Sequence, residues 1–225
     1  MPHMKRYSMP EFWPVPKKGK VFIVRPMPGP HPKEGCIPLQ VIVRDVLRYA
    51  ESQEEAKKIL REGKILVDKK PRKNPKFPVG LMDVIEIPEA KKHYRIGVNH
   101  RGLTLNEIDE KEANRKVCMI NGKTTVKKGM CQLNLHDGRN ILLKKDTYRV
   151  GDSVEISIPE QNILKHYRFE KGEKATIIAG RNIGVKGKIK DIHGRRNMLE
   201  KSVVVLETSG GEIKTLRDYI LVGEV

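Results

Sequence analysis

The stretch EAKKILREGKILVDKK at residues 55–70, followed by FPVGLMDVIEI at residues 77–87, changes from a helical pattern to a strand pattern. Ser52 and Glu55 form an S-x-x-E capping box at the start of the helical part, and Gly63 is placed to end it. The charges of this part run from acidic to basic, which suits the helix dipole. The stretch therefore predicts a helix, a turn and two short strands separated by a loop.

The residues upstream of this stretch predict another helix. Large apolar side chains recur at helical spacing from Pro38 to Ala50. Gln40, Arg44 and Arg48 follow one another at intervals of four, and we expect them on a separate, solvated face. Residues 37–87 are therefore expected to run helix, helix, turn, strand, loop, strand.

This order and these residues resemble the small RNA-binding domain named after ribosomal protein S4. The resemblance rests on EAKKILREGKILVDKK followed by FPVGLMDVIEI. In that family the first two helices and the adjacent loops present basic residues to structured RNA, and Lys and Arg suit phosphate oxygens. The alternative is that these basic residues are ordinary solvated charges on helix surfaces. The resemblance implies RNA contact at Arg44, Arg48, Lys57, Lys58, Arg61, Lys64, Lys69 and Arg72.

Residues 1–36 hold eight of the 14 prolines, with basic residues between them. Such a stretch cannot run as a helix, so we expect an extended basic arm. The arm also carries large apolar residues, including Phe12, Trp13, Val21 and Phe22, which are unusual in a freely solvated tail. We expect it to become ordered against RNA or a neighbouring domain. The arm residues predicted to contact RNA are Lys5, Arg6, Lys17, Lys18, Lys20 and Arg25.

Residues 93–169 predict a central antiparallel β domain. KVCMI-NG-KTTVK predicts a hairpin turn at Asn121 and Gly122, and CQLNL-HDG-RNILLKK predicts another at Asp137 and Gly138. In addition, VGDSVEISIP at residues 150–159 echoes VGLMDVIEIP at 79–88. We interpret this similarity as the same kind of turn leading into a strand in both places.

Residues 170–225 predict a further β domain. In EKATIIAGRNIGVKGKIKDIHGRRN (173–197), glycines interrupt an apolar strand, and lysines then alternate with Val185, Gly187 and Ile189. This alternation points the lysines outward together. The stretch resembles the KOW motif of ribosomal and transcription elongation proteins, which implies an SH3-like β-barrel. The residues predicted to meet RNA are Arg181, Asn182, Lys186, Lys188, Lys190, Arg195 and Arg196.

The end of the chain differs in charge from the rest. Residues 1–36, 37–92, 93–169 and 170–196 each carry more basic than acidic side chains, whereas residues 197–225 carry more acidic ones. We therefore expect the acidic side chains of the last segment to be turned away from the RNA-facing lysines. These acidic residues are Glu200, Glu207, Glu212 and Glu224.

The composition of the chain limits the kinds of binding partner and of reaction that we expect. The formal net charge of the 225 residues is +17, which points to a polyanion. No apolar run is long enough to predict a membrane span or a secretion signal, so we expect a cytoplasmic protein. The three cysteines and the scattered histidines match no metal, nucleophile or phosphate-loop motif. We predict no catalysis, no cofactor and no metal site.

The order of the four segments, an arm (1–36), an S4-type domain (37–92), a central β domain (93–169) and a KOW domain (170–225), predicts an α+β protein. It resembles the S4e family of archaeal and eukaryotic small-subunit ribosomal proteins. GLMDVI and MPGPHPKEG add to the resemblance. It implies a structural protein of the ribosome that binds rRNA beside neighbouring ribosomal proteins. Two alternatives remain: an RNA-modifying enzyme with an S4-type appendage, and a KOW-containing transcription elongation factor.

Overall fold

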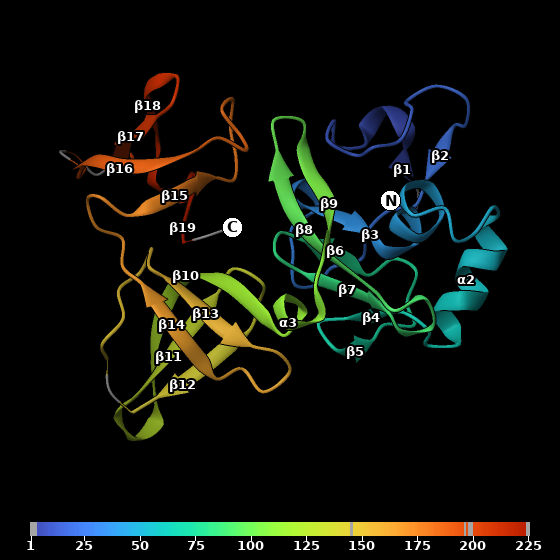
Figure 1. Cartoon of the computed structure of the whole chain (residues 1–225), viewed down its shortest axis with the longest axis horizontal. Helices are drawn as coiled ribbons and strands as arrows, with labels where there is room; N and C mark the ends of the chain where they lie inside the picture. Colours follow the sequence, from blue (N-terminus) through green and yellow to red (C-terminus); the bar gives the residue numbers. More distant parts are fainter. Residues whose placement is uncertain (1–3, 145, 196, 198–199, 224–225) are drawn as a thin grey trace. The chain divides into compact units, whose positions relative to one another are not determined.

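The computed structural model of the chain describes residues 4–144, 146–195, 197 and 200–223. Within it the chain divides into two compact units (Figure 1). The first unit comprises Met1–Gly97 and Leu103–Lys116, and the second comprises Val98–Gly102 and Val117–Val225. Strands outnumber helices in both, and the fold is α+β, as predicted.

The helix α2 (Gln53–Arg61) of the first unit forms as the sequence predicts. The side chain of Ser52 accepts a hydrogen bond from the backbone N–H of Glu55 at 3.1 Å, which caps the helix N-terminus. Ala56 and Leu60 are fully buried. Gly63 follows with φ +77°, the left-handed conformation that ends many helices.

The helix predicted upstream is not regular. A short α1 (Leu39–Val41) passes directly into a π-helical turn, η3 (Ile42–Val46). The backbone N–H of Leu47 donates to the carbonyl of Ile42 at 2.8 Å, so the ring spans five residues instead of four. The expectation of one regular helix as far as Ala50 was therefore wrong.

Gln40 also departs from expectation, because it does not lie on a solvated face. It is 1 % exposed, and its side-chain amide donates to the carbonyl of Gln53. Its neighbours Leu39, Val41 and Ile42 are fully buried as well. This segment is enclosed on all sides, and a buried amide in such a place is stabilised by a hydrogen bond.

The main sheet of the first unit has the strand order β5-β4-β7-β8-β9. The pairs β5–β4, β4–β7 and β7–β8 are antiparallel. A second, two-stranded sheet pairs β3 with β6. The bounds are β3 (Cys36–Pro38), β4 (Leu66–Val67), β5 (Lys70–Pro71), β6 (Pro78–Gly80), β7 (Val84–Ile87), β8 (Lys92–Asn99) and β9 (Gly102–Ile108), with η4 (Pro88–Ala90) between β7 and β8 and α3 (Glu110–Ala113) after β9.

The proline-rich segment packs against its own unit. The indole N–H of Trp13, a residue only 2 % exposed, donates to the carbonyl of Cys36 at 2.9 Å. The N–H of Met27 donates to the carbonyl of Lys76 at 2.9 Å. The segment is thus ordered by contacts within the first unit of the same chain. The segment contains β1 (Met4–Lys5), η1 (Arg6–Ser8), β2 (Phe22–Ile23) and η2 (Lys33–Gly35).

The first sheet of the second unit has the order β12-β11-β10-β13-β14. Its core is made by alternate residues of the strands, such as Ile120, Leu133, Val154 and Ile156, all fully buried. The bounds are β10 (Arg115–Val126), β11 (Met130–Leu135), β12 (Asn140–Leu143), β13 (Ser153–Ser157) and β14 (Ile163–Tyr167), with η5 (Lys127–Gly129) between β10 and β11.

One of the two predicted hairpins forms and the other does not. β11 and β12 are joined at Asp137 and Gly138, and Gly138 has φ +75°. At Asn121 and Gly122, however, β10 continues as one strand, and its register against β11 shifts between Ile120 and Gly122. The Asn-Gly pair therefore lies at a β-bulge, because the chain turns only at η5.

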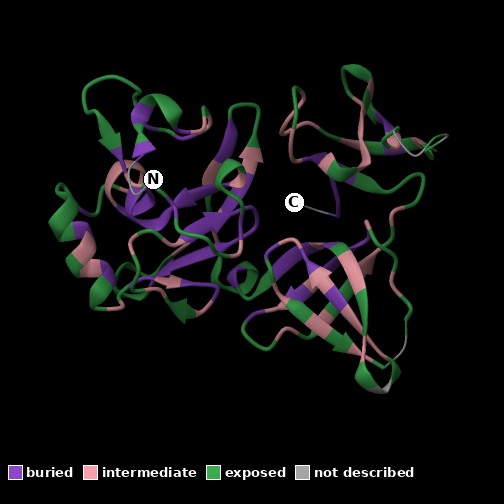
Figure 2. Cartoon of the chain, turned by 180° about the vertical axis from the view of Figure 1, so that it is seen from behind, coloured by how far each residue is buried: buried purple, intermediate pink, exposed green. Residues whose placement is uncertain are grey.

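The second sheet of this unit has the order β18-β17-β16-β15-β19 and is antiparallel throughout. Its core includes Ile177, Ile189, Leu206 and Ile220. Figure 2 shows buried, intermediate and exposed residues mixed along the strands of this unit. The bounds are β15 (Lys174–Ile177), β16 (Lys186–His193), β17 (Val203–Thr208), β18 (Gly211–Leu216) and β19 (Ile220–Val222), with η6 (Arg217–Tyr219) before β19.

Candidate nucleic-acid interface

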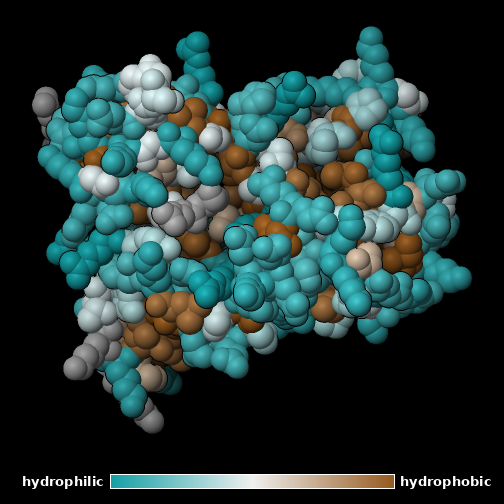
Figure 3. All heavy atoms as spheres, in the orientation of Figure 1, coloured by the Kyte–Doolittle hydropathy of each residue, from teal (hydrophilic) through white to brown (hydrophobic). Residues whose placement is uncertain are grey.

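The basic residues predicted to contact RNA fall into three groups. The arm and the S4-type segment supply two groups in the first unit, and β16 with its flanking loops supplies the third in the second unit. Hydrophilic side chains dominate the face drawn in Figure 3. The groups differ in how far their charges are already paired with carboxylates.

In the S4-type group, exposed and paired cations alternate along α2 and the turn that follows. Lys58 and Arg61 are exposed, and neither forms an ion pair within the described part of the chain. The pairs of Lys57 and Lys64 lie on the protein surface, where ion pairs are weak and can be exchanged for phosphate, whereas Lys69 pairs with the buried carboxylate of Glu86. The pairs are Lys57–Glu54 at 2.8 Å, Lys64–Glu62 at 3.1 Å and Lys69–Glu86 at 2.9 Å.

The remaining arginines of this group are held differently from one another. Arg44 is half-buried and makes two hydrogen bonds to Asp45, at 3.1 and 2.8 Å. Arg48 is exposed and has φ +57°. The guanidinium of Arg72 lies over the ring of Phe77, with its carbon 4.5 Å from the ring centroid. Arg48 therefore presents the most open charge of the three.

In the arm, five of the six predicted residues are exposed and one is buried. Arg6 is 6 % exposed, and its guanidinium donates to the carbonyl of Pro16 at 2.7 Å. Its side chain thus organises the arm's own backbone in this structure, and contact between Arg6 and RNA stays a prediction. Lys17 pairs with Glu11 at 3.2 Å. The exposed residues are Lys5, Lys17, Lys18, Lys20 and Arg25.

In β16, the lysine row (Lys186, Lys188 and Lys190) is exposed along one side, while Ile189 is buried. The period of two therefore places these side chains as the sequence predicts. Arg181 and Arg195, in the flanking loops, are exposed, Asn182 is half-buried, and Arg196 lies outside the described residues.

The acidic residues of the last segment are not all turned away from the lysine row, and this expectation was wrong. The carboxylate of Glu212 contacts the ammonium of Lys190. Glu207 stands opposite Lys188 in the β16–β17 register. The strand order places β17 beside β16 and β18 beyond β17, so carboxylates on these two strands partly neutralise the row. Glu200 is exposed, and Glu224 lies outside the described residues.

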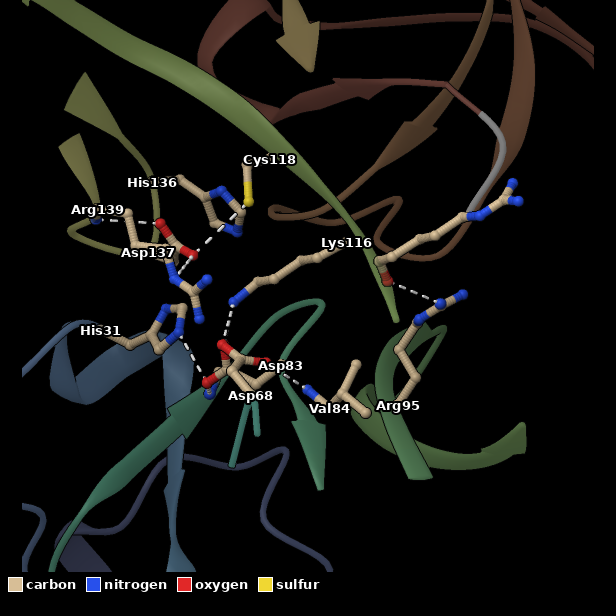
Figure 4. A network of polar contacts seen from close by, with 12 residues as sticks. His31, Asp68, Asp83, Val84, Arg95, Lys116, Cys118, His136, Asp137 and Arg139 are labelled. Atoms are coloured by element: carbon tan, nitrogen blue, oxygen red, sulfur yellow. Dashed lines mark hydrogen bonds and ion pairs between the residues drawn. The ribbon is translucent and has the colours of Figure 1, made fainter. Parts of the chain in front are cut away.

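Beneath the basic surface of the first unit lies a buried ion network made of His31, Asp68, Asp83 and Lys116 (Figure 4). The Lys116 ammonium is fully buried and contacts Asp68 Oδ2 at 2.9 Å and Asp83 Oδ1 at 2.5 Å. His31 Nε2 lies 3.0 Å from Asp83 Oδ2. The network joins the arm, the turn before β5, the start of β7 and the start of β10.

The buried ion network favours the ionised form of Asp83. Burial raises the pKa of Asp83, but the charges of Lys116 and His31 outweigh burial and leave this pKa well below its ordinary value. The fit around His31 is close, because a Cβ on Gly80 would lie 2.3 Å from the imidazole Cγ. Glycine at position 80 therefore allows the arm to dock.

No local pattern in the sequence predicts this network. Lys116 and Asp83 carried a visible signal, since each is a charged residue inside an otherwise apolar strand pattern (RKVCMI and GLMDVIEI). That signal names residues that need partners, but it does not say which residues are the partners.

The second unit contains a related acid–imidazole pair. His166 Nε2 lies 2.7 Å from Asp152 Oδ2. The ring of His166 also meets that of Tyr148 edge-on, with centroids 4.7 Å apart. Burial raises the pKa of Asp152, but hydrogen bonds from Phe169 N–H and from His166 leave it below its ordinary value. The pair anchors the start of β13 to β14.

The cysteines and the helices add no chemistry to the interface. Burial, with smaller effects of Asp83 and Glu34, raises the pKa of the Cys36 thiol to about 12. Cys118 is buried, Cys131 is half-buried, and none of the three cysteines forms a disulfide bond within the described residues. Among the described residues, no three His, Cys, Asp or Glu side chains are arranged to hold a metal. No helix in the described ranges has the length and apolar character to cross a membrane.

Comparison with known proteins gives matches along most of the chain. The RS4NT (NUC023) domain matches residues 2–34, the S4 domain matches residues 37–85, and the ribosomal family S4e matches residues 90–163. The small ribosomal subunit protein eS4 of Methanothermobacter thermautotrophicus is 47 % identical over 98 % of this chain and 91 % of its own length. That of Methanocaldococcus jannaschii is 44 % identical over 98 % of this chain and 93 % of its own length.

A solved structure is also similar. The crystal structure of the 30S ribosomal protein S4e from Thermoplasma acidophilum matches with a TM-score of 0.72 and 29 % sequence identity. The match covers 84 % of this chain and 95 % of the crystallised one.

Proposed function

This chain belongs to the ribosomal S4e family, and from that premise we propose that it binds small-subunit rRNA through its basic surfaces and stabilises the folded RNA. It is a structural constituent of the small subunit of the cytoplasmic ribosome. Its family is not known to include enzymes. The observation that carries the proposal is the 47 % identity over 98 % of the chain to a small ribosomal subunit protein.

The full-length match also bears on the two alternatives. An RNA-modifying enzyme would resemble eS4 proteins only in the S4 segment, and an elongation factor would resemble them only in the KOW segment. The relatives instead match across all four segments. We therefore retain the ribosomal function alone.

We propose that the domains lie at residues 1–36, 37–92, 93–169 and 170–225, and that the last of these is an SH3-like barrel carrying the KOW element. The five-stranded order β18-β17-β16-β15-β19 supports the barrel, since it brings the last strand back beside β15. The packing of Trp13 and His31 on the first unit supports treating residues 1–36 as an ordered arm.

The proposed mechanism is electrostatic. Lysines and arginines replace the counterions condensed on RNA phosphates, so affinity falls steeply as salt rises. A-form RNA is recognised by its backbone and shape more than by base edges. The exposed charges of Arg48, Lys58 and Arg61 are the most open sites for such contacts, and the lysine row is a partly neutralised one. Neighbouring proteins of the small subunit are further partners.

The test combines salt dependence with charge reversal. Binding of the full chain to small-subunit rRNA from Methanothermobacter thermautotrophicus is measured at several salt concentrations for wild type and for Lys58→Glu with Arg61→Glu. We expect weaker binding and a shallower salt slope for the double variant. Lys111→Glu, on α3 between two glutamates, is the matched control. A wild-type chain whose binding does not change with salt contradicts the proposal.

A further inference from the structure

The apolar side chains of the arm divide into a buried set and an exposed set. Trp13 and Ile23 are only 2 % and 8 % exposed, and they complete the core on which the arm packs. Tyr7, Val21 and Phe22 are 74 %, 66 % and 58 % exposed. Tyr7 lies in η1 directly after β1, and Phe22, directly after Val21, begins β2, which pairs with β1. These three exposed groups form an apolar patch.

The register of the β1–β2 ribbon explains this division. Met4 pairs with Ile23, and both side chains point inward. Lys5 pairs with Phe22, and both are exposed. Residues directly opposite on antiparallel strands have Cβ atoms about 5 Å apart. An ammonium group and an aromatic ring therefore stand side by side on the outer face of the ribbon.

Arg6 fixes the two ends of this patch. Its guanidinium donates to the carbonyl of Pro16 at 2.7 Å, and its backbone N–H donates to the carbonyl of Val21 at 3.0 Å. These bonds hold η1, which carries Tyr7, against the segment that leads into β2. The backbone that carries the exposed rings is thus held in position before any ligand arrives, which reduces the entropy lost on binding.

The charge around the patch favours a polyanion over an apolar protein surface. Lys5, Lys18 and Lys20 are exposed on the same segments. The sequence holds one acidic residue before Glu34, namely Glu11, and it pairs with Lys17 at 3.2 Å. A protein partner that covered the rings would also have to cover several lysines, whereas RNA supplies a base for a ring and phosphates for the lysines.

We propose that Tyr7 and Phe22 form a stacking platform for unpaired RNA bases, with Lys5, Lys18 and Lys20 holding the adjoining phosphates. A base inside a duplex has both faces covered by its neighbours, so a platform of this kind selects loops, bulges or single strands. The inference rests on the proposed rRNA binding and adds the class of nucleotide that the arm takes.

The test uses Tyr7→Ala, Phe22→Ala and their combination. Tyr7→Trp keeps a ring at position 7, and Leu142→Ala removes a similarly exposed apolar side chain from β12 as a matched control. The probes are a single-stranded oligoadenylate carrying 2-aminopurine, an RNA duplex of the same length, and small-subunit rRNA from Methanothermobacter thermautotrophicus. Thermal unfolding of each variant checks that the fold is retained.

We expect wild type to quench the 2-aminopurine fluorescence, because a stacked base loses emission. Each alanine variant should bind the single strand about 5- to 100-fold more weakly, the range that one lost stack gives. The salt slope and the affinity for the duplex should stay as in wild type. Tyr7→Trp should restore quenching, and Leu142→Ala should leave binding and quenching unchanged.

Two results would overturn the platform while leaving rRNA binding in place. In the first, the double alanine variant binds and quenches the single strand like wild type. In the second, it binds every RNA like wild type but no longer joins small subunits, which assigns the patch to a protein neighbour. If wild type bound none of the RNA probes, the proposed function itself would be refuted, and the platform with it.

Discussion

The turn that ends at Asp83 in the first unit and the turn that ends at Asp152 in the second share one set of hydrogen bonds. Each aspartate donates its backbone N–H to the carbonyl three residues earlier, in both cases at 3.2 Å. Each also accepts, at Oδ2, the backbone N–H of that earlier residue, Gly80 at 2.9 Å or Arg149 at 3.0 Å. Both oxygens then meet a histidine Nε2. An aspartate thus makes the same turn at both strand entries, although it is the fifth residue of the segment 79–88 and the third of the segment 150–159.

The two turns differ in what their second carboxylate oxygen meets. Asp83 Oδ1 contacts the buried ammonium of Lys116, and the His31 side chain is 3 % exposed. Asp152 Oδ1 accepts the backbone N–H of Phe169 at 3.0 Å, and the His166 side chain is 23 % exposed. The same turn therefore supports a fully buried charge network in one unit and a pair with a part-exposed histidine in the other. Removing a partner should cost far more in the first case.

The largest expected effect comes from Lys116→Met. The substitution leaves Asp68 and Asp83 buried without their cation, and we expect the free energy of unfolding to fall by about 3–5 kcal/mol. Urea unfolding followed by circular dichroism measures it. Lys123→Met, which removes a surface pair with Asp146, is the control and should cost at most about 1 kcal/mol. Equal losses for the two variants would remove the contrast between the turns.

A smaller effect separates the two histidines. His31→Ala should destabilise the chain by about 1.5–3 kcal/mol, since a hydrogen bond to a buried carboxylate is lost, and His166→Ala should cost about 0.5–1.5 kcal/mol. Limited proteolysis gives a second measurement. Residues 4–30 should be cut faster in His31→Ala and at the wild-type rate in His166→Ala. The comparison fails if His166→Ala loosens the arm as much as His31→Ala does.

The smallest effect is a difference in acid sensitivity. The pKa of each aspartate is lower in the folded chain than the value of about 3.9 in an unfolded one, so the unfolded state binds more protons at low pH. The stabilisation is complete above about pH 5 and is lost as pH falls below about 4.

Replacement of either aspartate by asparagine should therefore flatten the fall in stability with acid. Asp83→Asn should flatten it more than Asp152→Asn does, because Asp83 interacts with two cationic partners in a fully buried site. Urea unfolding at a series of pH values from about 5 to about 2 measures both slopes. Identical slopes for wild type and Asp83→Asn would show that Asp83 is not the residue that titrates.

Local patterns were predictable from the sequence, and long-range partners were not. The capped helix α2, the Asp137–Gly138 turn and the outward lysine row each follow from residues close together in the chain. The prediction of a hairpin turn at Asn121–Gly122 was wrong because an Asn-Gly pair fits a bulge as well as a hairpin. The pairing of β10 with β11 decides between the two. The Lys190–Glu212 contact depended on strand order in the same way.

The sequence separations within the buried ion network bear on how the first unit acquires its fold. His31 and its partner Asp83 are 52 residues apart, and Asp83 and Lys116 are a further 33 apart. Asp152 and His166, in contrast, are separated by only 14 residues. On a growing polypeptide, the arm leaves the ribosome first but cannot be locked until the beginning of β10 has emerged. Contacts of such long range slow folding, so the first unit to be synthesised need not be the first to finish.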